Sequence, residues 1–189
     1  MEKIVEQIFT ESIGVKQETL KKNLPSIVKS AEMIIEAFKN HHKLFLCGNG
    51  GSAADSQHIA AEFVGRFQKE RSAWPAIALT TDTSALTALG NDYSFDIVFS
   101  RQLQALGQKG DVLMAISTSG NSKNILEAVK QAKTMGIKTI AVTGDNGGQL
   151  AGACDIAMIA ASSKTARIQE AHLCIFHSIC ELVENTLTK

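Results

Sequence analysis

Residues 111–136, DVLMAISTSGNSKNILEAVKQAKTMG, contain a complete strand–loop–helix unit. The apolar run at 111–117 predicts a buried strand, and the apolar spacing at 121–136, which ends on a glycine, predicts an amphipathic helix. Between them, residues 117–122 form a short loop rich in hydroxyl groups. A strand that runs directly into a helix is the repeating unit of a parallel sheet.

The same alternation extends along the chain in both directions. Further apolar runs predict strands at residues 43–48, 75–80, 138–144 and 155–160. Helical patterns occupy residues 52–67, 84–107 with a break at Gly90-Asn91-Asp92, and 165–187. Strands that alternate with helices favour right-handed crossovers. We therefore expect an α/β fold, a three-layer α/β/α sandwich around a parallel five-stranded sheet.

The first 40 residues precede every predicted strand. Their apolar spacing predicts two helices separated at residues 23–26, because Pro25 interrupts a helix. We expect this helical N-terminal extension to pack beside the sheet or against another subunit. Neither a linker nor a repeat is visible, so residues 1–189 are expected to form a single domain.

Composition limits the classes of function. Lys plus Arg equals Asp plus Glu, 19 each, so the totals give no basic footprint for direct nucleic-acid binding, and zero net charge favours an oligomer. No apolar stretch reaches the ~18 residues of a membrane span, and the acidic start does not resemble a secretory signal. The four cysteines lack CxxC spacing, which indicates reduced thiols and a cytoplasmic location. Arg66 and Arg71 are interpreted as solvated surface charge, with phosphate binding in a neighbouring subunit as the alternative.

Three loops at the carboxyl ends of predicted strands have unusual compositions: CGNGGS (47–52), STSGNS (117–122) and TGDNGG (143–148). Ligands of parallel sheets bind at this edge. The second loop has four hydroxyl groups directly before a helix, whose free N–H groups and dipole favour an anion such as a phosphate monoester. The alternative is a polar turn with a helix cap, which requires only one hydroxyl group.

Gly48, Gly50 and Ala53 in the first loop also fit the dinucleotide fingerprint G-x-G-x-x-A. That fingerprint requires an acidic residue about 20 residues further on, at the end of the next strand. Glu70 lies before that strand and Asp82 lies too far along. Nicotinamide binding is therefore disfavoured.

His58 and Glu62 are four residues apart, so they project from one face of the helix that follows the first glycine-rich loop. A histidine and a carboxylate at this spacing suit a divalent metal ion or acid–base chemistry. The alternative is an exposed polar pair of the kind that many helices have on their surface.

The C-terminal helix contains possible partners in Gln169, Glu170, His172 and His177. Residues 170 and 177 are seven apart and nearly aligned, whereas residues 169 and 177 are offset by roughly 80°. Spacing alone therefore favours Glu170, together with His177, as the partners of His58 and Glu62.

Several long motifs resemble one family. They are CGNGGSAADSQHIAAEFVGRF (47–67), GND (90–92), GDVLMAISTSGNS (110–122) and ARIQEAH (166–172), with a later histidine. These segments resemble the sugar isomerase (SIS) family and, within it, the phosphoheptose isomerases, and the resemblance covers nearly the whole chain. It implies a homotetramer with active sites between subunits. It also implies the interconversion of sedoheptulose 7-phosphate and D-glycero-D-manno-heptose 7-phosphate, which leads toward the heptose of lipopolysaccharide.

The resemblance implies a role for individual residues. One zinc ion per subunit is expected on His58, Glu62, Gln169 and His177, which replaces the preference for Glu170. Substrate contacts are expected from Asn49, Gly50, Gly51, Glu62, Asn91, Asp92, Ser117, Thr118, Ser119, Ser122 and Gln169. Glu62 is expected to act as the base and His177 as the acid, through an enediolate intermediate.

Other segments resemble a different branch of the same fold, the replication-initiator-associating adaptors, which are not enzymes. They are FTESI (9–13), PAIAL (75–79), QALG (104–107) and CELVENTLTK (180–189). An adaptor with a protein partner is therefore the alternative to the isomerase, and a protein with both roles is a third possibility. The adaptor pattern departs from the four-residue metal set at the glutamate and the last histidine, whereas this chain keeps all four, so the isomerase is preferred.

Overall fold

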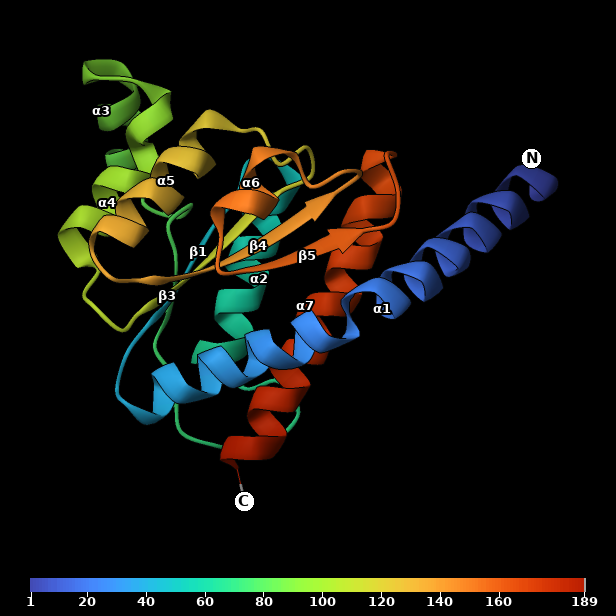
Figure 1. The fold of residues 1–189 in the computed structure, drawn as a ribbon, viewed down its shortest axis with the longest axis horizontal. Coiled ribbons are helices and arrows are strands. Elements are labelled where there is room, and N and C mark those ends of the chain that lie inside the picture. The colour runs from blue at the N-terminus through green and yellow to red at the C-terminus, as the bar shows by residue number, and fades with distance from the viewer. Residues whose placement is uncertain (189) are drawn as a thin grey trace.

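The computed structural model describes residues 1–188. Five parallel strands form one sheet in the order β2-β1-β3-β4-β5, covered by helices on both faces (Figure 1). The strands are β1 (Leu44–Cys47), β2 (Ala76–Ala78), β3 (Val112–Ser117), β4 (Lys138–Gly144) and β5 (Ile156–Ala160). The helices are α1 (Glu2–Lys39), α2 (Gly51–Val64), α3 (Thr83–Asp92), α4 (Val98–Leu106), α5 (Lys123–Thr134), α6 (Gly148–Ala153) and α7 (Thr165–Leu187), with a short 3-10 helix, η1 (Phe95–Ile97). The predicted three-layer α/β/α fold is confirmed.

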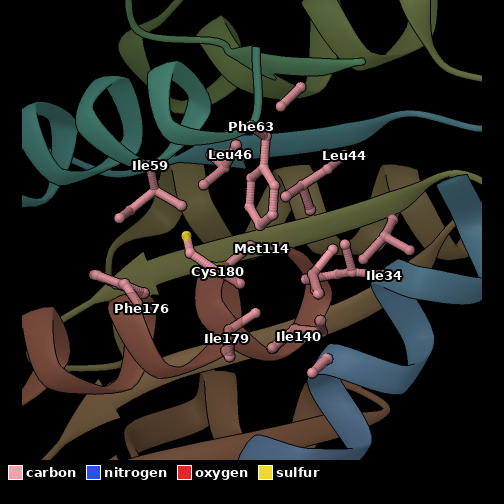
Figure 2. Close-up of a cluster of buried hydrophobic side chains, with 14 of the residues drawn as sticks. Ile34, Leu44, Leu46, Ile59, Phe63, Met114, Ile140, Phe176, Ile179 and Cys180 are labelled. Atoms are coloured by element: carbon pink, nitrogen blue, oxygen red, sulfur yellow. The ribbon is translucent and has the colours of Figure 1, made fainter. Parts of the chain in front are cut away.

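Both faces of the central strands are buried. Along β3, Met114 packs on the side of α1, α2 and α7, whereas Leu113 packs on the side of α4, α5 and α6. Figure 2 shows the first of these two cores, in which Phe63 of α2 and Phe176 of α7 meet the sheet. Successive strand side chains point to opposite faces, so a strand buried on both sides has a continuous apolar sequence. This is the pattern that identified the strands.

The prediction of two helices in the first 40 residues is wrong. α1 is continuous from Glu2 to Lys39, with Pro25 inside it. Proline removes one helical hydrogen bond, but the helix is held on each side of it. After the proline, Ile27, Ile34 and neighbouring apolar residues of α1 bury their side chains in the core. Before it, Thr19 and Asn23 form hydrogen bonds to the backbone at β5. Figure 1 shows that α1 changes direction part-way, and that its first turns project beyond the rest of the subunit.

Polar side chains attach α1 to the edge strand β5. Asn23 accepts a hydrogen bond from the backbone N–H of Ile159 (2.8 Å) and donates one to the carbonyl of the same residue (2.9 Å). The hydroxyl of Thr19 accepts from the N–H of Ala161 (3.0 Å). These side chains replace the strand partner that β5 lacks on this side, so α1 covers an otherwise open sheet edge.

Two smaller differences concern the segments between strands. Residues 90–92 do not break a helix but form the last turn of α3, and the chain turns after them at Tyr93 and Ser94. The short helix α6 was not predicted. None of the helices within residues 1–188 combines the length and the apolar character needed to cross a bilayer.

Candidate active site

The loops after β1 and β3 meet where the strand order reverses. β1 pairs with β2 on one side and with β3 on the other. The helices that follow β1 and β3, α2 and α5, therefore start next to each other and cover opposite faces of the sheet. The side-chain amides of Asn49 and Asn124 exchange two hydrogen bonds of 2.9 Å across this point. Ligands of open parallel sheets bind in the crevice at such a reversal. The structure therefore places the predicted substrate contacts Asn49, Gly50 and Gly51 at the position where this fold binds ligands.

The hydroxyl groups of the β3–α5 loop cluster together. The Oγ atom of Ser117 lies 3.1 Å from that of Ser122 and 3.5 Å from that of Ser119. Ser122 precedes α5, yet its hydroxyl makes no capping hydrogen bond within the described chain. The alternative interpretation, in which a serine serves only as a helix cap, therefore lacks its expected hydrogen bond. The clustered hydroxyl groups and the free N–H groups of α5 can instead face an anion.

Gly120 shapes this loop. Its φ angle is 64°, in the left-handed region that glycine adopts readily, and an added Cβ atom would overlap the carbonyl of Gly147. The loop after β3 thus packs directly on the turn after β4. Beside them lies a cavity of about 270 Å³, whose mostly polar lining includes Thr118 and Ser119.

α2 and α7 run side by side in the same direction. An added Cβ atom on Gly51, the first residue of α2, would overlap the side-chain amide of Gln169 near the start of α7. Further along both helices, the ring centroids of His58 and His177 are 5.2 Å apart. Nε2 of His58 lies 3.0 Å from Oε1 of Glu62. The structure thus brings His58, Glu62 and His177 together, with Gln169 closer to the β1–α2 loop.

This cluster is accessible to solvent. The side chain of His58 is 43% exposed and that of Glu62 is 23% exposed, so a ligand can reach both. One turn earlier on α2, Asp55 has one carboxylate oxygen without a hydrogen-bond partner in residues 1–188. Burial raises the pKa of Asp55, and nearby His58 opposes this. Sequence reasoning missed Asp55, although it stands three residues before His58 on the same helix.

Glu170 lies outside the cluster. Its carboxylate forms an ion pair with Arg167, and its pKa is lowered by hydrogen bonds from Ser12 of α1 and from Arg167. Spacing favoured Glu170 because that argument treated α7 in isolation. The first residue of α2, Gly51, lies next to Gln169, and His58 further along α2 lies next to His177. The angular positions of residues around α7 alone therefore do not identify those that face α2.

The donor groups of His58, Glu62 and His177 fit zinc in kind, because imidazole nitrogen and carboxylate oxygen are zinc ligands. The 3.0 Å between His58 and Glu62 is close to the ~3.3 Å that separates two ligands of a tetrahedral zinc ion with bonds of about 2.0–2.1 Å. However, no group of three or more His, Cys, Asp or Glu side chains in residues 1–188 is arranged to hold a metal ion. Zinc binding by His58, Glu62, Gln169 and His177 therefore stays a prediction.

Asn91 and Asp92 are not part of this cluster. They end α3, are exposed, and hydrogen-bond to each other through their side chains (2.8 Å). Figure 1 places α3 at one end of the molecule, well away from α7. A subunit therefore does not bring these two residues to its own His58 and His177.

Arg71 is not the solvated surface charge that the sequence suggested. Its side chain is only 3% exposed and forms an ion pair with Glu184 of α7 at 3.1 Å. The two residues are 113 positions apart, so no local pattern indicates the pair.

Comparison with known proteins places these features in a family. A family model described as the SIS domain matches residues 8–144. The phosphoheptose isomerase of Campylobacter concisus is 56% identical over 161 residues, which cover 85% of each chain. The chain belongs to the phosphoheptose isomerase family of SIS-domain proteins.

Further phosphoheptose isomerases support this membership. That of Clostridium acetobutylicum is 50% identical over 189 residues, 99% of this chain and 96% of the relative. The solved structure of the phosphoheptose isomerase from Neisseria gonorrhoeae superimposes with a TM-score of 0.92 at 47% identity, covering 97% of this chain and 98% of that one. The resemblance found in the sequence motifs is confirmed, and it extends to the helical N-terminus of the phosphoheptose isomerase fold.

Proposed function

We propose that the protein interconverts sedoheptulose 7-phosphate and D-glycero-D-manno-heptose 7-phosphate, in the synthesis of the heptose of lipopolysaccharide. Beyond family membership, one observation carries this proposal. Two helices that are far apart in the sequence bring His58, Glu62 and His177 together. The hydroxyl loop that follows β3 lies at the carboxyl edge of the sheet, where α2 also begins.

The arrangement suits proton transfer between adjacent carbons. A ketose becomes an aldose in two coupled transfers. A base removes a proton from the carbon beside the carbonyl group and returns it to the former carbonyl carbon, while an acid protonates the carbonyl oxygen and recovers a proton from the neighbouring hydroxyl group. Glu62 is the base in this proposal, because it is a partly exposed carboxylate whose orientation is held by His58 at 3.0 Å. His177 is the acid, because its ring lies beside His58. The negative charge that develops on oxygen in the enediolate requires fixed donors near it.

The loop at 117–122 holds the phosphate group. Its clustered hydroxyl groups donate hydrogen bonds, and the first N–H groups of α5 add favourable dipoles. Binding the phosphate at a distance from the reacting carbons supplies binding energy that positions those carbons. Asn49, Gly50 and Gly51 then contact the sugar from the opposite loop.

Zinc is the proposed cofactor, one ion per subunit, with His58, Glu62, Gln169 and His177 as the residues that would hold it. When bound, it would supply Lewis-acid stabilisation of a developing oxyanion. A carboxylate bound to a metal ion is a weaker base, so either Glu62 would leave the ion during turnover or the ion would be partly structural.

A homotetramer is the proposed assembly. The projecting half of α1 exposes Ile4, Val5, Ile8, Phe9 and Ile13. A largely apolar groove of about 280 Å³ between α1 and α7, lined in part by Leu20 and Ile175, offers a surface for such residues of another subunit. Asn91 and Asp92 would then reach an active site across a subunit interface. A cytoplasmic location is proposed with it, because the four cysteines form no disulfide in the described chain.

The adaptor alternative is not favoured. The relatives that match most of the chain at 50–57% identity are named as isomerases. An adaptor has no need for His58, Glu62 and His177 to converge in an accessible cluster.

The experiment is an isomerase assay on sedoheptulose 7-phosphate, together with metal analysis of protein purified without chelator. We expect turnover and about one zinc per subunit. His177→Gln is expected to abolish turnover, whereas His41→Asn, at an exposed residue remote from the site, keeps it. Absence of turnover with and without added zinc would refute the proposal and support the adaptor.

A further inference from the structure

Arg71 terminates the helix that contains His58 and Glu62. Its guanidinium donates to the carbonyl of Glu62 (2.7 Å), and also to the carbonyls of Phe63 (2.9 Å), Gly65 (3.1 Å) and Ser72 (3.0 Å). The last carbonyls of a helix have no partner inside it. Arg71 satisfies two of the last four in α2, those of Glu62 and Phe63, and also that of the capping residue Gly65. The cation also opposes the negative end of the helix dipole.

Glu184 of α7 balances this charge. Its side chain is 2% exposed and accepts from Nε of Arg71 (3.1 Å) and from the backbone N–H groups of Phe67 (3.0 Å), Gln68 (2.7 Å) and Lys69 (2.9 Å). Burial raises the pKa of this carboxyl group, but hydrogen bonds from the three backbone N–H groups and from Arg71 outweigh it and lower the pKa. The loop after α2 is thus tied to α7 through a single carboxylate.

The pair is connected to both residues assigned to proton transfer. Glu184 lies seven residues after His177, two turns along the same face of α7. The ring of Phe67, whose N–H group bonds to Glu184, packs against the ring of His177 with centroids 5.5 Å apart. On the other helix, Arg71 holds the backbone carbonyl of Glu62 itself.

We propose that Arg71 and Glu184 are a positioning pair for the isomerase reaction, which holds α2 against α7 so that Glu62 and His177 keep their separation. This inference rests on the proposed function. A buried ion pair adds little net stability compared with apolar residues of the same size. Its hydrogen bonds are directional, however, and they specify one arrangement of the two helix ends. Apolar side chains would allow several.

The test compares Glu184→Gln with Asp111→Asn, two changes that each neutralise a buried carboxylate. Asp111 is fully buried, pairs with Lys43 at 3.3 Å and accepts from the N–H groups of Lys43 and Gln108 (2.8 Å each). It lies just before β3, at the amino end of that strand, whereas the proposed ligand loops follow the carboxyl ends. We expect both variants to lower the melting temperature. Only Glu184→Gln is expected to lower kcat, by about 10–100-fold, since a shift on the order of 1 Å costs about that much.

The Michaelis constant separates positioning from binding. In Glu184→Gln we expect KM to stay within about threefold of wild type, because the phosphate loop is untouched. Arg71→Lys keeps the charge, but the three donors of an ammonium group cannot serve four carbonyls and Glu184 together, so the same fall in kcat is expected. A kcat within about twofold of wild type in a folded Glu184→Gln, with the same loss of stability as Asp111→Asn, would show a structural role only.

A second measurement does not depend on activity. In chelator-treated protein without substrate, the ring signals of His58 and His177 in histidine NMR spectra should move by more than their line width in Glu184→Gln and stay in place in Asp111→Asn. If the wild type has no isomerase activity, the proposed function is refuted. The spectra then still show whether Arg71 and Glu184 hold His58 and His177 in place. If Glu184→Gln does not fold, Arg71→Lys replaces it, because this change keeps the buried positive charge and removes the guanidinium hydrogen bonds to the carbonyls of Glu62 and Phe63. Unmoved signals in a folded variant would overturn the inference.

Discussion

Gly51→Ala is expected to disturb the active site while leaving the stability of the fold unchanged. Gly51 is the first residue of α2, and its backbone is not in the left-handed region, so alanine is sterically allowed there. The three atoms nearest to an added Cβ atom all belong to the side chain of Gln169: the amide nitrogen would overlap the new methyl group, and the amide carbon would lie at 3.2 Å. The end of a flexible side chain can move away, so the fold survives and Gln169 leaves its position.

Gly51→Ala is expected to lower the reaction rate without lowering the stability of the fold. Non-bonded carbon contacts lie at about 3.5–4.0 Å, so the amide must move by on the order of 1 Å. A displacement of this size in a catalytic constellation costs about 100-fold in rate. Alanine is better than glycine inside a helix by up to about 1 kcal/mol, so the melting temperature should stay equal or rise slightly.

The assay measures kcat for sedoheptulose 7-phosphate and the melting temperature of each variant. Gly152→Ala is the matched control, because this glycine lies in α6 and a Cβ atom there meets nothing within 4 Å in the described part of the chain. We expect the control to keep full activity. A Gly51→Ala protein with activity within about threefold of wild type would refute the role assigned to Gln169.

Three further predictions address the phosphate loop, pH and assembly. Ser122→Ala should raise KM by about 10–150-fold without changing the melting temperature, because a hydrogen bond to a charged group is worth about 1.5–3 kcal/mol; an unchanged KM would remove Ser122 from the phosphate site. Burial lowers the pKa of His172 from 6.5 to about 4. As pH falls, the unfolded chain therefore binds a proton at His172 at a higher pH than the folded chain does. The free energy of unfolding decreases as pH falls from 6.5 toward 4, by about 2 kcal/mol between pH 7 and pH 5. Urea unfolding at both pH values measures this loss, which His172→Gln should reduce; an equal loss in that variant would contradict the assignment. Phe9→Asp should shift the mass measured by light scattering from a tetramer to a smaller species, and an unchanged tetramer would exclude Phe9 from the interface.

Much of the fold was predictable, because strands buried on both faces have continuous apolar sequences. Residues 111–117 identified β3 almost to the residue, and residues 138–144 identified β4. Pro25 misled the prediction of α1, since a local rule about proline does not include the packing of the residues on either side. The short helix α6 has too few residues to show a helical period.

The site was predictable only where its residues are close in sequence. The spacing of His58 and Glu62 indicated a shared face, and the structure brings their side chains to 3.0 Å. The choice between Gln169 and Glu170 depends on where α2 crosses α7, which no spacing on α7 reveals. It came from the family resemblance, and the contact of Gln169 with the β1–α2 loop agrees with it.

Long-range partners had no sequence signal at all. Asn49 and Asn124 are 75 positions apart, and Arg71 and Glu184 are 113 apart. Each pair consists of common polar residues, and only the folded chain shows that they meet.

The central claim is that the carboxylate of Glu62 removes the proton, and Glu62→Gln tests it most directly. The amide keeps the shape and the hydrogen bond to His58 but cannot accept a proton. We predict that the variant binds sedoheptulose 7-phosphate with nearly wild-type affinity and that its kcat falls by at least about 100-fold. An isomerisation rate within a few-fold of wild type would contradict the account.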